Sequence, residues 1–96
     1  MGKSMDTEEV RSLYEAILSL KNIDECFCFF EDLCTANEIL AMSSRYEVAK
    51  LLTMNKTFNE ISQKTGASTA TISRVNRSLK FGKDGYAMVM KRNKDL

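Results

Sequence analysis

The sequence predicts an all-helical protein. Its 96 residues include no proline and only four glycines, so few positions would break a helix. Apolar residues recur at the three- and four-residue spacing of amphipathic helices, and no stretch alternates apolar and polar residues as a half-buried strand does. Hydrophobic residues make up 44% of the composition. That is enough for a folded chain, and the length predicts a single domain over residues 1–96.

The first helix is expected to begin after Thr7 and to end near Lys21–Asn22. Thr7 can cap it, and the acidic residues that follow oppose the positive end of the helix dipole. Its apolar stripe follows the spacing i, i+3, i+4, i+7, i+8 and consists of Val10, Leu13, Tyr14, Ile17 and Leu18.

A second helix, capped by Asn22 or Asp24, covers residues 25–34 and is apolar nearly all round. Burial of each of its three phenylalanines would contribute about 1.5–3 kcal/mol. A chain of this length has few elements to cover such a helix. The segment therefore favours a homodimer whose chains wrap round each other, and an ordinary central core helix is the alternative.

Three cysteines, Cys26, Cys28 and Cys34, fall in that helix. Their odd number, the absence of histidine and the lack of a C-x-x-C pair argue against both a disulfide framework and a metal site. We expect them to be small buried hydrophobes in a reducing compartment, with redox sensing as the alternative. No cofactor is indicated.

Thr35 and Glu38 form a T-x-x-E capping pattern that opens a third helix over residues 36–54. Ser44 and Glu47 repeat the pattern, so two shorter helices divided near Ser43–Ser44 remain possible. We favour the single helix. Residues 7–55 are then the dimerisation helices.

Residues 57–80 carry the strongest pattern in the chain. Thr57 opens a capping box and a helix over residues 58–65, which Gly66 ends by turning left-handed. Ser68 can cap the next helix, whose apolar stripe is Ile72, Val75 and Leu79. Two short helices joined by a glycine-containing turn predict a helix-turn-helix, whose second helix enters the major groove of DNA.

Residues 81–96 form a C-terminal extension. Gly82 and Gly85 end the preceding helix, and residues 86–91 favour a short helix over a strand. The cations of this extension either reach phosphates or form a solvated tail; they include Lys91, Arg92 and Lys94.

Charge is sorted along the chain although the net charge is only +1. Residues 1–38 carry −6 and residues 56–80 carry +4. Chance sorting is one explanation, but coincidence with the helix-turn-helix indicates a polyanion, double-stranded DNA, as the partner. No run approaches the roughly 18 apolar residues of a membrane span, and no signal-peptide core is present. We expect a cytoplasmic protein, associated with the nucleoid when bound to DNA.

The DNA-binding residues follow from how such helices dock. The first residues of the second helix meet base edges, and here they are short, so specificity would depend on water bridges and DNA shape. Two copies on paired half-sites are expected. A helical pair that binds protein instead of DNA is the alternative. The expected contacts are Lys56, Asn59, Lys64, Ser68, Thr69, Ala70, Thr71, Ser73, Arg77 and Lys80.

The segments LSLKNIDECFCFFEDLCTANEI, NKTF, ASTATISRVNRSLK and FGKDGY resemble the YerC/YecD group of Trp-repressor-like proteins, over nearly the whole chain. TATISR and SLK are similar, more distantly, to the tryptophan repressor itself. The resemblance implies a Trp-repressor-like all-α fold, an intertwined homodimer with a helix-turn-helix on each flank, and one long helix over residues 36–54. The first helix of the motif lacks the basic residues that the repressor has at the positions of Asn59 and Ser62.

The resemblance also implies an effector pocket. Arg45 and Arg74 correspond to the repressor's two ligand-flanking arginines, although periodicity alone makes them surface ion-pair residues. Thr35 and Ser78 match two further pocket residues. Val75 stands where the repressor has a glycine beside the ligand's ring, and its added volume argues against tryptophan at a cost of about 1–3 kcal/mol. A smaller carboxylate ligand, or no ligand, fits better.

The sequence therefore predicts a homodimeric, sequence-specific DNA-binding transcriptional regulator, a repressor. A helical protein-interaction module and a cysteine redox sensor are the alternatives. An enzyme is not expected, because histidine, a nucleophile–base arrangement and a phosphate loop are all missing from the sequence.

Overall fold

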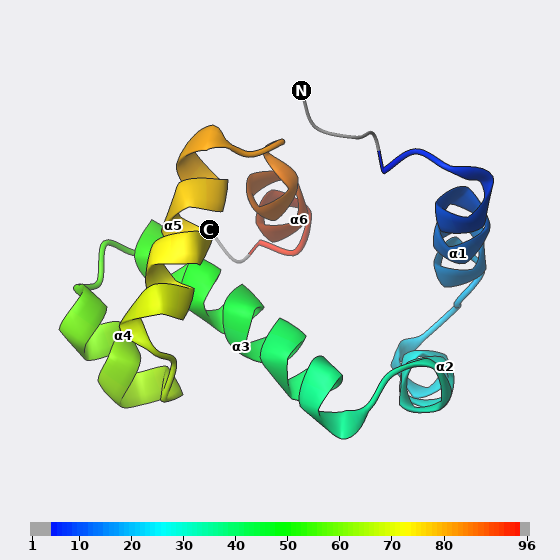
Figure 1. Ribbon diagram of the computed structural model, residues 1–96, viewed down its shortest axis with the longest axis horizontal. Coiled ribbons are helices and arrows are strands. Elements are labelled where there is room, and N and C mark those ends of the chain that lie inside the picture. The colour runs from blue at the N-terminus through cyan, green and yellow to red at the C-terminus, as the bar shows by residue number, and fades with distance from the viewer. Residues whose placement is uncertain (1–4, 95–96) are drawn as a thin grey trace. The chain divides into compact units, whose positions relative to one another are not determined.

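The computed structural model describes residues 5–94, in which the chain forms six α-helices and no strand (Figure 1). The all-helical fold class is confirmed. None of the described helices is long and apolar enough to cross a membrane. The helices are α1 (Glu8–Leu18), α2 (Ile23–Leu33), α3 (Ala36–Thr53), α4 (Phe58–Thr65), α5 (Thr69–Phe81) and α6 (Gly85–Arg92).

The chain divides into two compact units, Met1–Thr35 and Ala36–Leu96. The boundary falls inside residues 7–55, the segment that we expected to serve dimerisation. Helix α3 thus shares a unit with the helix-turn-helix.

In the N-terminal unit, α1 ends earlier than the sequence predicted. It stops at Leu18, and the Ser19 hydroxyl donates a hydrogen bond of 2.6 Å to a carbonyl of the last turn. The expected end near Lys21–Asn22 is wrong because Asn22 already caps α2, accepting a hydrogen bond of 2.9 Å from the Glu25 N–H. Asn22, and not Asp24, is therefore the cap. The Glu25 carboxylate accepts in turn from the Lys21 N–H at 2.9 Å.

No residue of α1 or α2 is buried. Leu18 is 83% exposed, Ile23 73% and Phe27 61%. Cys26 and Cys28 are exposed and Cys34 is half-buried, so the expectation of buried cysteines is wrong for the first two within one chain. An apolar pair of helices that remains exposed is poorly stabilised by its own packing.

The C-terminal unit is built on α3, a single helix of 18 residues, as we favoured over two shorter ones. Its end is formed by Asn55, which has a left-handed φ of 63°. The N–H of Lys56 donates to the Leu51 carbonyl at 3.1 Å, and the N–H of Asn55 to the Leu52 carbonyl at 3.0 Å. This pair of bonds is a Schellman motif, which directs the chain from α3 into α4.

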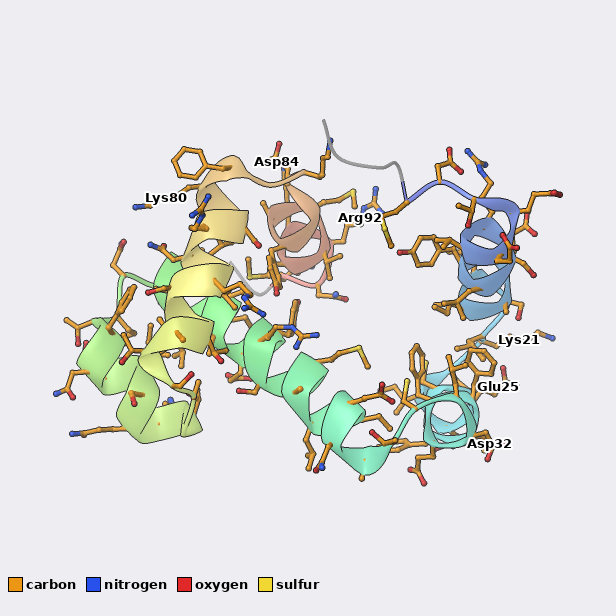
Figure 2. All side chains as sticks on the ribbon, in the orientation of Figure 1. Lys21, Glu25, Asp32, Lys80, Asp84 and Arg92 are labelled. Carbon is orange, nitrogen blue, oxygen red and sulfur yellow. The ribbon has the colours of Figure 1, made fainter. Side chains whose placement is uncertain are left out.

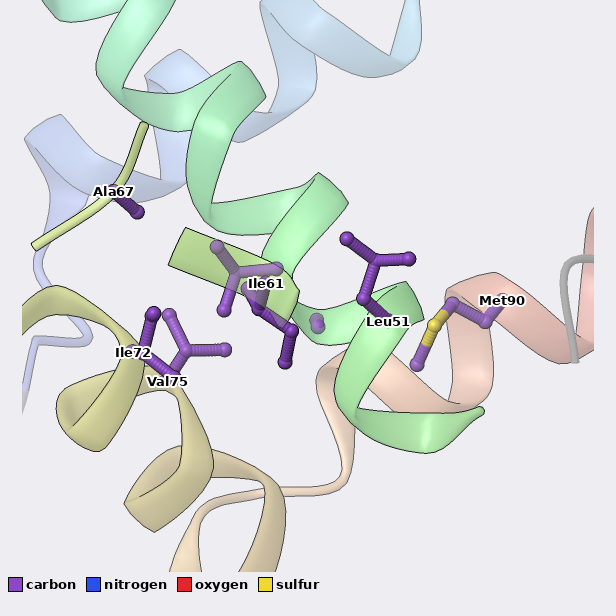
Figure 3. Packing of buried hydrophobic residues seen from close by; sticks show 8 residues of the cluster. Leu51, Ile61, Ala67, Ile72, Val75 and Met90 are labelled. Carbon is purple, nitrogen blue, oxygen red and sulfur yellow. The ribbon is translucent and has the colours of Figure 1, made fainter. Parts of the chain in front are cut away.

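The buried hydrophobic residues of the described chain all lie in this unit (Figure 3). They come from the C-terminal part of α3, from α4, from the turn between α4 and α5, from α5 and from α6. Helices α4 and α5 both contact α3. Residues 36–47 of α3 include no buried residue. The core consists of Val48, Ala49, Leu51, Ile61, Ala67, Ile72, Val75 and Met90.

The segment after α5 forms α6, so the helical interpretation is confirmed. Gly82 ends α5 at a point where a Cβ atom would lie 2.4 Å from the Ser78 carbonyl oxygen, so only glycine fits. Helix α6 then packs on α3, where Met90 is buried and the rings of Tyr46 and Tyr86 stack with centroids 6.5 Å apart.

Candidate nucleic-acid interface

Helix α4 begins with the predicted capping box. The Thr57 hydroxyl accepts a hydrogen bond of 3.1 Å from the Glu60 N–H, and the Thr57 N–H donates one of 2.8 Å to the Glu60 carboxylate. The hydrogen bonds from Thr57, with a smaller contribution from the charge of Lys56, hold the pKa of Glu60 below its usual range. The start of α4 is therefore fixed at neutral pH.

The turn between α4 and α5 is held by side chains as well as by Gly66, whose φ is 74°. The Thr65 hydroxyl donates to the Ile61 carbonyl at 2.8 Å and accepts from the Ala67 N–H at 3.1 Å. The Ser62 hydroxyl donates to the Ala67 carbonyl at 3.1 Å. Sequence reasoning found the glycine but not these bonds. Together they fix the angle at which α5 leaves the turn.

Helix α5 begins at Thr69, capped by Ser68. The Ser68 Oγ accepts from the Thr71 N–H and donates to the Thr71 hydroxyl oxygen, each at 3.1 Å. The cap thus occupies the Ser68 side chain. The side chains of Thr69, Ala70 and Ser73 are exposed on the first turns of α5.

Three faces run along α5. Ile72 and Val75 are buried against the core. A second face carries the exposed Thr69, Ala70, Ser73 and Arg77. The third carries Thr71 and Arg74, one turn apart, and faces α3. Thr71 is half-buried, so of the residues expected to touch DNA it lies farthest from open solvent.

The predicted phosphate contacts are exposed cations around this surface: Lys56, Lys64, Arg77 and Lys80. Lys80 extends outward from α5 (Figure 2). Among residues 5–94 no salt bridge engages any of the four. The one acidic residue of segment 56–80 is Glu60, whose carboxylate is bound to Thr57. Asn59 is exposed at the start of α4. The surface therefore carries positive charge that the described chain does not neutralise.

Beside this surface lies a hollow of about 140 Å³ between α3 and α5. Two of its lining side chains are the arginines Arg45 and Arg74, and no carboxylate lines it. Within the part of the chain that the structure describes, no salt bridge engages either arginine. The remaining lining residues are Ala41, Ser44, Ala67 and Thr71. Ser44 was not predicted from the sequence as a lining residue, although its position directly before Arg45 could have indicated it.

Of the four expected pocket residues in the C-terminal unit, the structure brings together only Arg45 and Arg74. Val75 is 1% exposed and belongs to the core. Ser78 lines a separate apolar hollow of about 610 Å³ with Tyr46 and Tyr86. Thr35 is the exposed last residue of the N-terminal unit. In residues 5–94 no group of three His, Cys, Asp or Glu side chains is placed to hold a metal ion.

This fold and surface define an all-helical protein of the helix-turn-helix class. The family model described as Trp repressor protein matches residues 8–94. The chain therefore belongs to the Trp repressor family, a family of DNA-binding regulators.

Relatives of similar length support this assignment. YerC of Bacillus subtilis strain 168, described as uncharacterized, is 50% identical over 88 residues, which cover 92% of this chain and 85% of YerC. The crystal structure of a TrpR-like protein from Eubacterium eligens has a TM-score of 0.92 and 58% identity, and the match covers 94% of this chain and 93% of that one. A proposed Trp repressor from Staphylococcus aureus has a TM-score of 0.93 and 47% identity, covering 96% and 92%. The predicted resemblance is confirmed.

Proposed function

We propose that the protein is a homodimeric transcriptional repressor that binds double-stranded DNA through α4 and α5. The observation that carries this proposal is the exposed N-terminal face of α5 on a turn fixed by Gly66, Ser62 and Thr65. Unneutralised cations surround that face. Cations of this kind bind backbone phosphates, and the short side chains of α5 can approach base edges closely.

The exposed apolar side chains of α1 and α2 support the homodimer. Leu18, Ile23 and Phe27 are each more than half exposed. A second copy that covered them would remove this apolar surface from water and would present two helix-turn-helix units to paired half-sites. We propose that the dimer acts in the cytoplasm at the nucleoid.

Fluorescence anisotropy with labelled duplexes tests DNA binding. The duplexes come from selection of bound fragments of genomic DNA, which also yields the operator. The logarithm of the binding constant should fall linearly with the logarithm of salt concentration, by about 0.9 per neutralised phosphate. Arg77→Ala should lower the slope by about one, and Lys21→Ala, on the linker between α1 and α2, should leave it unchanged. Binding without salt dependence would refute the phosphate contacts.

Repression itself requires a reporter placed downstream of the selected operator. Expression should fall when the protein is present and recover with a Ser73→Glu variant, because a carboxylate on the α5 face repels the DNA phosphates. A rise in expression on adding the protein would make it an activator.

The size of the hollow at Arg45 and Arg74 bears on the small carboxylate effector that the sequence predicts. A hollow of about 140 Å³ is smaller than the roughly 300–1,000 Å³ typical of small-molecule sites, which supports the argument against tryptophan. Addition of tryptophan should therefore leave the melting temperature unchanged. A clear rise would overturn the argument from Val75 and from the size of the hollow.

A further inference from the structure

Ala67 is the point at which side chains of α4 bind the turn that leads into α5. Its N–H donates to the Thr65 hydroxyl at 3.1 Å, and its carbonyl accepts from the Ser62 hydroxyl at 3.1 Å. The Thr65 hydroxyl also donates to the Ile61 carbonyl at 2.8 Å, one turn back in α4. Ala67 is 9% exposed and belongs to the core. Two hydroxyls of α4 therefore satisfy both backbone polar groups of a buried residue, and such bonds are costly to lose.

The exposed N-terminal face of α5 carries side chains of short reach, which are those of Thr69, Ala70 and Ser73. Alanine has no side-chain rotamer, and a hydroxyl attached to Cβ can move only by rotation about one bond. Such side chains cannot follow a base edge when the helix that carries them shifts. Lysine and arginine have long flexible stems and can still reach a phosphate after such a shift. A displaced α5 should therefore lose base contacts while the phosphate contacts persist.

We propose that Ser62 and Thr65 are positioning residues that determine the sequence specificity of α5. Their hydroxyls hold Ala67, the residue directly before the Ser68 cap of α5. Functional side chains are effective when they are held within about 0.5 Å of the productive geometry, and the two hydroxyls supply that support at the start of α5. The inference rests on the proposed DNA binding and assigns specificity to two residues that act through α5.

Two substitutions remove these bonds and leave the core side chains in place. Thr65→Val keeps the branched shape and removes both bonds of the hydroxyl, whereas Ser62→Ala removes one. Fluorescence anisotropy compares the selected operator with a scrambled duplex of equal length and composition. Operator affinity should fall about tenfold for Thr65→Val and about three- to tenfold for Ser62→Ala. Affinity for the scrambled duplex should stay within about twofold, and the salt slope should be unchanged because no phosphate contact is lost.

The ratio of the two affinities decides the proposal. Equal weakening on both duplexes, or a ratio that neither variant changes, overturns it. The matched control is Thr53→Val, because the Thr53 hydroxyl donates to the Ala49 carbonyl at 2.9 Å through the same four-residue spacing, at the end of α3. Thr53→Val should leave the ratio unchanged below the melting temperature, and a loss as large as that of Thr65→Val would make general stability the cause. Thr65→Ser keeps a hydroxyl that can form both bonds and should restore the ratio to within about twofold.

Amide hydrogen exchange of the full chain without DNA tests the bonds themselves. The Ala67 N–H should exchange about tenfold faster in Thr65→Val than in the wild type. Equal protection in the two proteins would show that the hydroxyl does not hold the turn, and the inference would be wrong. If the wild type does not distinguish the operator from the scrambled duplex, the proposed function fails and this inference fails with it. If the wild type distinguishes them and Thr65→Val does so equally well, only this inference fails.

Discussion

The two units of the chain place their apolar side chains differently. In the described residues, the unit over residues 36–96 has eight buried hydrophobic residues and the unit over residues 1–35 has none. Helices α4 and α5 are therefore held on α3 by a core of their own. Helices α1 and α2 expose side chains that in most proteins would be covered. The C-terminal unit therefore has a core of its own, whereas apolar side chains of α1 and α2 are exposed in the single chain.

Charge separates the same two regions. Residues 1–35 carry −5 and residues 36–96 carry +6. The acidic region is unsuited to DNA, whereas the basic region is suited to phosphates. We propose that α1 and α2 serve assembly and that α4 and α5 serve DNA binding.

The largest effect is expected from matched substitutions of isoleucine. Ile72→Ala removes a fully buried side chain and should lower the free energy of unfolding by about 2–5 kcal/mol at any protein concentration. Ile23→Ala, at a position 73% exposed, should cost less, and its cost should depend on protein concentration if a dimer covers it. Urea denaturation at several protein concentrations measures the free energy of unfolding of both variants. Equal and concentration-independent losses would contradict the comparison.

Phe27→Asp tests assembly through its effect on DNA binding. A charge in the middle of the exposed face of α2 should separate the dimer, and loss of the second reading unit should weaken DNA binding by about a hundredfold or more. Ser12→Asp adds the same charge to an exposed polar position of α1 and serves as the control in the same anisotropy titration. If both variants bind as the wild type does, α2 has no part in assembly.

Gly82→Ala probes the C-terminal unit alone. The added Cβ would lie 2.4 Å from the Ser78 carbonyl oxygen, so the end of α5 must shift, at a cost of about 1–3 kcal/mol. Gly85→Ala meets no atom within 4 Å and should be neutral or stabilising by up to about 1 kcal/mol. Thermal denaturation of the two variants should therefore give shifts of different size. Similar shifts would show that the close approach at Gly82 is absent.

The smallest effect concerns the capping box at Glu60. Its folded-state pKa lies below the unfolded value because of the hydrogen bonds from Thr57, so the stabilisation is present above the unfolded pKa and is lost as pH falls through the folded pKa. Wild type should lose more stability than Glu60→Gln on acidification from neutral pH, since glutamine keeps a cap without a charge. Melting temperatures of wild type and Glu60→Gln, measured from neutral to acidic pH, give the stability that each loses. Parallel curves would rule out a contribution from the Glu60 charge.

The helix-turn-helix could be predicted from the sequence because its signals are local. Thr57, Gly66 and Ser68 each act within a few residues, and the structure begins and ends α4 and begins α5 where they indicate. The end of α1 could not be placed in the same way, since no glycine or proline stands between Leu18 and Asn22. There the cap of the next helix decides the boundary.

The hollow at Arg45 and Arg74 could not be derived from periodicity, which made both residues surface ion-pair partners. It depends on how α5 crosses α3, and that crossing is set by the buried Ile72 and Val75. The resemblance indicated the two arginines together. It did not indicate that Ser78 lines a different hollow, one turn farther along α5.

Sedimentation equilibrium of the full chain tests the division between the two units most directly. We expect the mass of two chains at micromolar concentration, with dissociation only on dilution or in Phe27→Asp. The mass of one chain at every concentration, in protein that circular dichroism shows to be folded, would contradict it.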